Sequence, residues 1–220
     1  MKPQFITFTG VDSIDTDSIV TMEALSDKYP LEWGVLASET RTGNDPRYPN
    51  KDVIKYLLDQ KHMRFALHAC GASARAILNN DATPFFDSWI ANSSVRRVQL
   101  NARDVSDAQY QNGINWAKER NVVPIFQSRT TTFPKSENAV YLFDTSGGNG
   151  KTPSFWPTNP SATGMVGYAG GMNPENVAGI VEFIENIGNR YWIDMESGVR
   201  TDNIFDFEKI TAVCKAVYGH

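Results

Sequence analysis

Short apolar runs alternate along the chain with segments whose apolar residues recur at helical spacing. The apolar runs predict eight strands, over residues 5–9, 33–37, 65–70, 95–100, 122–127, 140–143, 165–169 and 191–195. Helices are predicted between them, from Asp15 or Asp17 to about 28, from 50 or 51 to 60, over 72–79, around 85–91, from 106 or 107 to 120, and over 177–187. The segments after the fifth and sixth strands have no room for a full helix.

The order of these elements predicts the fold class. Strands that alternate with helices favour parallel pairing with right-handed crossovers. Such a sheet either closes into a (β/α)8 barrel or stays open as a doubly wound sheet. We favour the barrel because polar candidate residues follow nearly every strand, as expected when eight loops share one rim, and because no GxGxxG motif follows the first strand. We therefore expect an α/β protein with one (β/α)8 TIM-barrel domain over residues 1–220.

Two glycine-containing turns near the end of the chain indicate a ligand. Gly170 and Gly171 follow the seventh predicted strand, and Ser197 and Gly198 follow the eighth. Glycines let a ligand approach bare backbone amides, which favour an anion, most often a phosphate. Taken alone, each turn is better explained as an ordinary tight turn. Together they match the loops after strands 7 and 8, which form a recurrent phosphate site in (β/α)8 barrels.

Composition narrows the class of protein. Hydrophobic residues make up 41% of the chain and charged residues 21%, which is typical of a globular domain. A net charge of -4 and a pI near 5.4 argue against a general nucleic-acid surface. No signal-peptide core opens the chain, and no stretch approaches about 18 apolar residues, so we expect a cytoplasmic protein without a membrane partner. Cys70 and Cys214 match no metal-binding spacing, and we expect two reduced thiols and neither metal nor cofactor.

Three segments of the last third resemble a known family. The segments FDTSGGNGKTPSFW (143–156), YAGGMNPENV (168–177) and IDMESGVRTDNIFDFEKI (193–210) are similar, in order and spacing, to the last three βα segments of phosphoribosylanthranilate isomerase. VQLN (98–101) and FTG (8–10) are weaker similarities to its fourth and first strands. The resemblance implies a TIM barrel of tryptophan biosynthesis that binds a phosphorylated small molecule. It leaves the oligomeric state open.

The resemblance also implies a reaction. The family catalyses an Amadori rearrangement, in which an aminoaldose ring opens and a proton leaves carbon 2 to give an aminoketose. A cysteine at the end of the first strand is its general base, and an aspartate at the end of the sixth is its general acid. Asp144 matches the acid, but Thr9 stands in the position of the cysteine. Because a hydroxyl is far less acidic than a thiol, another base must act or the reaction is lost.

The resemblance assigns binding roles to further residues. Arg47 approximately matches an arginine that holds the substrate's anthranilate carboxylate, although a surface arginine on a long loop explains it equally well. Asn101 replaces a family histidine and is expected to face the ligand. Gly148 joins the residues of the two late turns as a candidate for phosphate binding.

Several polar residues have more than one interpretation from the sequence. Glu39 follows the second strand and either contacts the ligand or is solvated. His68 and Cys70 share one strand face, which points into the barrel mouth or packs against helices; we expect buried packing for Cys70 and leave both open for His68. Asp12 serves the site, a turn or a helix cap. Glu196 replaces a family serine beside the expected phosphate, where a carboxylate would repel a dianion.

Two functions therefore remain. The first is a phosphoribosylanthranilate isomerase-like enzyme, an aldose–ketose isomerase that uses Asp144 as acid and an unidentified base. The second is a noncatalytic or respecialised barrel that binds a phosphorylated ligand after losing the base. Asp144 favours the enzyme, whereas Thr9 and Glu196 favour the binder.

Overall fold

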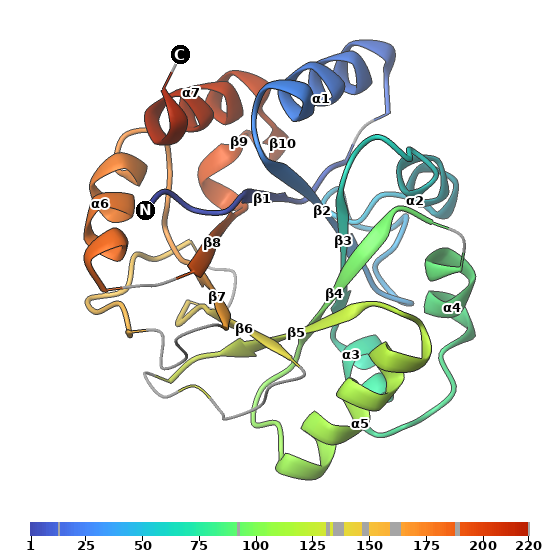
Figure 1. Ribbon diagram of the computed structural model, residues 1–220. Helices are drawn as coiled ribbons and strands as arrows, with labels where there is room; N and C mark the ends of the chain where they lie inside the picture. Colours follow the sequence, from blue (N-terminus) through green and yellow to red (C-terminus); the bar gives the residue numbers. More distant parts are fainter. Residues whose placement is uncertain are drawn as a thin grey trace.

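The computed structural model is a closed parallel barrel surrounded by helices (Figure 1). It describes residues 1–12, 14–91, 93–130, 133, 139–146, 150–158, 164–187 and 190–219. The barrel strands are β1 (Ile6–Thr9), β2 (Leu31–Ala37), β3 (Phe65–Cys70), β4 (Val95–Asn101), β5 (Val123–Ser128), β6 (Val140–Phe143), β7 (Met165–Ala169) and β8 (Arg190–Met195). Each strand pairs in parallel with its sequence neighbours, and β8 closes on β1 through the pairs Ile6–Ile193, Thr7–Asp194 and Phe8–Met195. The predicted fold class is confirmed.

Helices follow most strands and pack on the outside of the barrel (Figure 1). They are α1 (Thr16–Lys28), α2 (Lys51–Leu58), α3 (Ala72–Leu78), α4 (Pro84–Ile90), α5 (Asp107–Glu119), α6 (Val177–Ile187) and α7 (Phe207–Tyr218). Side-chain caps fix several starts, because Asp15, Asn50 and Ser106 each accept a hydrogen bond from a backbone amide three residues on. In the described residues no helix follows β5 or β6, as the sequence predicts.

A small hairpin follows β8 and was not expected from the sequence. The short helix η1 (Ser197–Val199) leads into β9 (Arg200–Thr201), which pairs antiparallel with β10 (Ile204–Phe205). Asp202 and Asn203 form its turn with positive φ values of 49° and 63°. These two residue types tolerate that left-handed conformation, so a two-residue hairpin turn forms without glycine.

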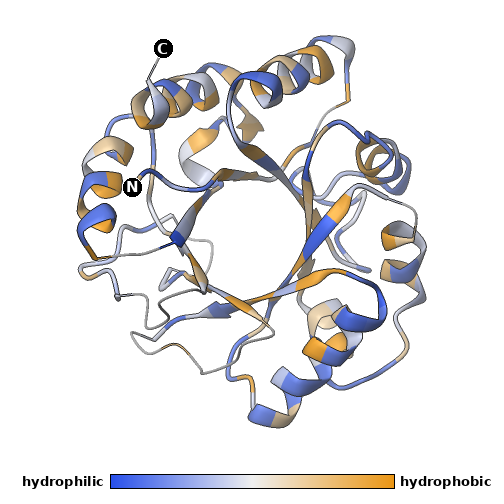
Figure 2. Ribbon diagram, in the orientation of Figure 1, coloured by the Kyte–Doolittle hydropathy of each residue, from blue (hydrophilic) through white to orange (hydrophobic). Residues whose placement is uncertain are grey.

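Strand side chains alternate between the outer core and the barrel interior, and Figure 2 shows hydrophobic and hydrophilic residues interleaved along the strands. Outward side chains such as Ile6, Phe8 and Trp33 belong to the main hydrophobic core with the helices. A second core cluster consists of Phe5, Ile125, Leu142, Ala169 and Trp192. The described helices include none that is long and apolar enough to cross a membrane.

A buried ion pair lies deeper in the barrel than the strand ends. Arg97 donates from Nε to Glu32 at 2.9 Å and from Nη2 to the other carboxylate oxygen, while Thr7 donates to Glu32 at 3.0 Å. The Arg97 guanidinium also stacks over the Trp192 ring, 4.3 Å from its centroid. Burial alone would raise the pKa of Glu32, but Arg97 and Thr7 hold it below its usual value. The charged pair therefore belongs to the barrel interior.

Candidate functional site

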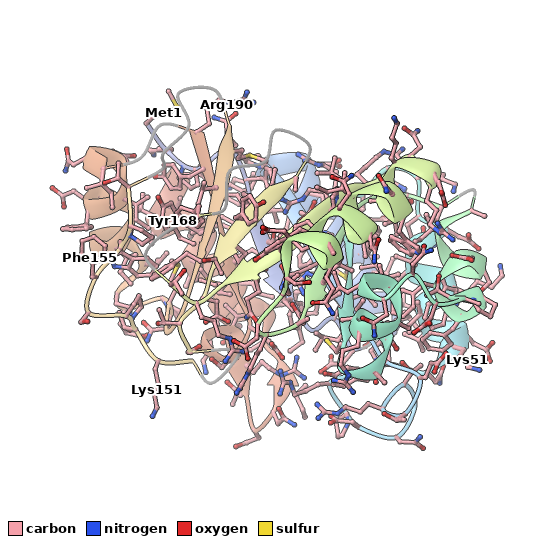
Figure 3. All side chains as sticks on the ribbon, turned by 90° about the horizontal axis from the view of Figure 1, so that it is seen from below. Met1, Lys51, Lys151, Phe155, Tyr168 and Arg190 are labelled. Carbon is pink, nitrogen blue, oxygen red and sulfur yellow. The ribbon has the colours of Figure 1, made fainter. Side chains whose placement is uncertain are left out.

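A pocket of about 310 Å³ opens at the carboxyl ends of the barrel strands. In Figure 3, Arg190 at the start of β8 lies at one end of the molecule and Lys151, in the loop after β6, at the other. Every barrel strand or the residue after it contributes to the pocket: Thr9, Leu36, His68, Cys70, Gln99, Asn101, Gln127, Asp144, Ala169 and Asp194. These residues share one property: they occupy the last inward-facing positions of their strands, so period-two alternation directs them to a common mouth.

Thr9 and Asp194 form a buried pair on adjacent strands of this pocket. The Thr9 hydroxyl donates to Oδ1 of Asp194 at 2.8 Å, and both side chains are at least 95% buried. Gly34 on the neighbouring β2 provides the room, because a Cβ there would overlap the Thr9 hydroxyl. Burial raises the pKa of Asp194 to about 8, with the charges of Glu196 and Glu32 adding to the rise and the Thr9 hydrogen bond opposing it.

Asp144 follows β6, and two described residues, Gln127 and Ser146, donate hydrogen bonds that orient its carboxylate. Gln127 on β5 donates from Nε2 to Oδ2 at 2.8 Å. Ser146 donates to Oδ1 from its backbone amide at 3.0 Å and from its hydroxyl at 2.8 Å. The predicted acid is therefore buried, oriented and placed in the same pocket as the Thr9–Asp194 pair.

Strands β3 and β4 supply a polar wall to the pocket. Gln99 donates to Asn101 at 2.8 Å, and Asn101 donates to the Cys70 sulfur at 3.2 Å. His68 Nε2 and Gln99 Oε1 are buried and have no protein partner in the described residues. Burial lowers the pKa of His68 to about 4, so its imidazole is neutral at pH 7. The prediction that Cys70 packs in the core is wrong: its position on the inward face of β3 directs the thiol to the pocket.

The long loop after β2 closes one side of the pocket with an ion pair. Arg47 contacts Glu196, the residue after β8, through Nη2 and through an Nε donor at 2.6 Å. Arg41, on the same loop, donates to the Tyr48 hydroxyl at 3.3 Å. Burial raises the pKa of Glu196, and Arg47 opposes that rise. Arg47 therefore lines the pocket, and its charge is directed to a protein carboxylate.

Glycines allow the loops after β6, β7 and β8 to pack closely against one another. A side chain at Gly171 would overlap Thr152, one at Gly150 would overlap the Ser197 hydroxyl, and one at Gly198 would overlap the Met172 carbonyl. Gly170 and Gly171 also have positive φ values of 128° and 61°, which favour glycine. Among the described residues, no protein acceptor is paired with the amides of Gly170, Gly171 or Ser197. These three residues line the pocket, whereas Gly198 does not.

The remaining candidate site residues do not line the pocket or are outside the described residues. Glu39 is exposed outside the pocket, because it comes after the inward positions of β2 have ended, and its amide donates to Ser73. Asp12 forms an ion pair with Arg200, which also donates to the Gly10 carbonyl at 2.6 Å and so ties the loops after β1 and β8 together. Gly148 is outside the described residues. No group of acidic, histidine or cysteine side chains that could hold a metal occurs in the described part of the chain.

Several residues that line the pocket were not predicted as site residues from the sequence: Arg41, Tyr48, Gln99, Arg103, Gln127, Arg129 and Asp194. Period-two alternation could have found the strand residues among them. In β8, for example, Trp192 and Asp194 share the inward face, so Asp194 follows directly from the predicted strand. Arg103 and Arg129 lie in the loops after β4 and β5, where the sequence carries no comparable signal.

The barrel and its pocket define a class of protein, the (β/α)8 barrels with a polar site at the carboxyl ends of the strands. Within this class, the family described as N-(5'-phosphoribosyl)anthranilate (PRA) isomerase matches residues 56–216. The chain belongs to the PRA isomerase family. The match begins within α2, so Thr9 and Arg47 lie outside the matched residues.

Solved structures agree with the fold. N-(5'-phosphoribosyl)anthranilate isomerase from Pyrococcus furiosus has a TM-score of 0.64 at 16% identity, over 99% of this chain and 100% of that chain. A phosphoribosyl anthranilate isomerase in complex with reduced 1-(o-carboxyphenylamino)-1-deoxyribulose 5-phosphate has a TM-score of 0.62 at 14% identity, with all of both chains covered. A 3-hexulose-6-phosphate synthase from Salmonella typhimurium scores 0.56 at 13% identity, also over both whole chains. Comparison with curated protein sequences finds no match.

Proposed function

We propose that this protein is an aldose–ketose isomerase of the phosphoribosylanthranilate type, with Asp144 as general acid and Asp194 as general base. The observation that carries the proposal is the hydrogen-bonded Thr9–Asp194 pair, at the position to which the family resemblance assigns the cysteine. A buried carboxylate thus lies beside the position of the missing thiol, in the pocket that also contains Asp144. The pair offers a base on β8 in place of one on β1.

The proposed chemistry needs two proton transfers. The carboxyl group of Asp144 gives a proton to the ring oxygen as the bond from that oxygen to carbon 1 breaks and the nitrogen forms an iminium. The Asp194 carboxylate then removes the proton from carbon 2, and the electrons of that bond form the enolamine, which tautomerises to the aminoketose. A base with a pKa near the working pH combines proton affinity with a useful ionised fraction, and the pKa of Asp194, raised by burial to about 8, meets this requirement.

Thr9 has a positioning role in this proposal. Its hydroxyl donates to Oδ1 of Asp194, and no described protein group donates to Oδ2. The hydrogen bond fixes the rotamer of the carboxylate and leaves the second oxygen to face the substrate. The weak acidity of a hydroxyl is then no obstacle, because Thr9 itself transfers no proton.

The phosphate of the substrate is assigned to the amides of Gly170, Gly171 and Ser197. Their lack of protein acceptors in the described residues and the absence of side-chain bulk at the two glycines support this assignment. Glu196 is adjacent, but its ion pair with Arg47 compensates its charge and reduces the repulsion of a dianion. A relative with this fold binds reduced 1-(o-carboxyphenylamino)-1-deoxyribulose 5-phosphate, which is therefore a suitable probe for this chain.

A noncatalytic binder is the second candidate, favoured by Thr9 and by the engagement of Arg47 with Glu196. Turnover by the unmodified protein and by Thr9→Cys separates the two, because only the enzyme turns over substrate without the substitution. If divergence removed only the base, the new thiol should give a large gain in isomerisation rate. If Asp194 is the base, Thr9→Cys removes the positioning hydroxyl and gives no gain.

Growth rescue tests the proposed activity. The unmodified gene should restore tryptophan-independent growth to a host that lacks phosphoribosylanthranilate isomerase, and Asp144→Asn and Asp194→Asn should each abolish that rescue. Immunoblots of the soluble fraction control for expression. Failure of the unmodified gene to restore growth despite soluble expression would exclude the isomerase activity and favour the noncatalytic binder.

A further inference from the structure

Four arginines line the pocket, and they fall into two pairs. Arg41 and Arg47 lie on the loop after β2, where Arg41 contacts Tyr48 and Arg47 is held by Glu196. Arg103 and Arg129 lie in the loops after β4 and β5. Neither of this second pair has a salt bridge to a described residue. Among the described residues, Arg103 and Arg129 are thus two pocket cations without a salt bridge.

The second pair is held close together by the barrel. Strands β4 and β5 are hydrogen-bonded neighbours, so the loops that follow them lie side by side. Burial lowers the pKa of Arg129, and the like charge of Arg103 lowers it further. Nη2 of Arg129 donates to Gln127 at 3.3 Å, whereas its Nε is buried without a partner in the described residues. A buried donor without a partner and a repelling neighbour are both stabilised by an anion.

We propose that Arg103 and Arg129 form a second anion subsite, which binds the carboxylate of a ligand whose phosphate lies at Gly170, Gly171 and Ser197. The inference rests on the proposed function for the phosphate end of the ligand. In the closed strand order, β4 and β5 are separated from β7 and β8 by β6, so the ligand spans the pocket past Asp144. The ligand class is a sugar phosphate that carries a carboxylate on its other half.

The local charges favour a carboxylate over a second phosphate. Asp144 and Asp104 both act on Arg129 electrostatically and favour its charged form. These acidic side chains near Arg129 disfavour a dianion more strongly than a monoanion. Planar guanidinium groups also match the two oxygens of a carboxylate in a bidentate arrangement. Arg47 is already engaged, through Nε and Nη2, with Oε1 of Glu196, so the subsite uses other residues than the arginine that the family resemblance implies.

Calorimetric titration with three probes tests the subsite. The probes are inorganic phosphate, reduced 1-(o-carboxyphenylamino)-1-deoxyribulose 5-phosphate, and the same compound without its carboxyl group. The variants are Arg103→Ala, Arg129→Ala and their combination, with Arg47→Ala as the matched pocket arginine. Circular dichroism confirms that each variant is folded. We expect the double variant to bind the carboxylated probe at least about tenfold more weakly and to leave the other two probes unchanged.

The Arg47→Ala control and the remaining outcomes distinguish the carboxylate subsite from the phosphate site of the proposed function. Arg47→Ala should change the affinity for the carboxylated and uncarboxylated probes by the same factor. A selective loss of the carboxylated probe in Arg47→Ala, or an equal loss of both phosphorylated probes in the double variant, would overturn the subsite while leaving the phosphate site intact. If the unmodified protein binds none of the three probes, the phosphate site of the proposed function fails, and the subsite fails with it.

Discussion

At the scale of single residues, the Thr9 hydroxyl controls the acidity of Asp194. Its hydrogen bond stabilises the carboxylate and opposes the rise in pKa that burial causes. We predict that Thr9→Val raises the pKa of Asp194 further and moves the acidic limb of the rate–pH profile upward by about one pH unit, since a hydrogen bond to a charged group contributes roughly 1.5–3 kcal/mol. Profiles of kcat/KM for both proteins measure the shift. An unchanged limb would mean that the hydroxyl does not act on the base.

The raised pKa of Asp194 also predicts a pH dependence of stability. The carboxyl keeps its proton up to a pKa of about 8 in the folded chain, whereas in the unfolded chain it ionises near about 3.9. The stability it contributes is therefore complete below pH 4 and is lost as pH rises towards 8. Relative to the unmodified protein, Asp194→Asn should gain in free energy of unfolding between pH 4.5 and pH 8. Urea denaturation measures this gain, and Asp27→Asn, at an exposed position of α1, should show no such trend.

The buried ion pair of Arg97 and Glu32 gives a third prediction at the residue scale. Arg97→Met leaves the Glu32 carboxylate buried without its partner, and we expect a loss of about 3–5 kcal/mol in the free energy of unfolding. Adding Glu32→Gln removes the unpaired charge and should recover part of that loss. Chemical denaturation of the two variants decides the matter: equal stabilities would show that the charge of Glu32 is not what destabilises the single variant.

At the scale of elements, three loops depend on glycines for their mutual contact. Gly198→Ala forces a methyl group into the Met172 carbonyl and should separate the loops after β7 and β8. We predict a loss of about 1–3 kcal/mol in stability together with weakened phosphate binding. Gly179→Ala in α6 is the matched control: its methyl group meets open space, and the variant should be neutral or more stable by about 0.5–1 kcal/mol. Thermal unfolding with and without phosphate compares the two; identical behaviour would contradict the packing role.

The bounds of the strands could be predicted from the sequence, whereas the orientation and the distant partners of some side chains could not. All eight strands begin and end within two residues of their predicted bounds, because buried strands are short apolar runs between clear turn signals. Asp144 and the late glycine turns were predicted from motifs that follow strand ends. Cys70 was misplaced and Glu39 kept two interpretations because the orientation of each depends on where the alternation of its strand stops. The Arg47–Glu196 contact joins residues 149 positions apart, and no local pattern encodes it.

At the scale of the whole molecule, the barrel brings residues from every strand or strand end to a single mouth. Asp194 on β8 and Asp144 after β6 meet in this pocket only because the strands close in sequence order. Closure also makes the Asp194 carboxylate on β8 and the Thr9 side chain on β1 neighbours, so under the proposed function a base on β8 can serve the same part of the pocket as one on β1. The central claim is that this carboxylate replaces the thiol of the family.

The rate at which the purified protein converts phosphoribosylanthranilate to the aminoketose tests this claim most directly. The unmodified protein should turn over the substrate, and Asp144→Asn and Asp194→Asn should each be slower by a factor on the order of 10² to 10⁴, the usual contribution of a general acid or base. Folding of each variant is checked by circular dichroism. Turnover by Asp194→Asn at the rate of the unmodified protein would contradict the account, and so would a folded unmodified protein without turnover.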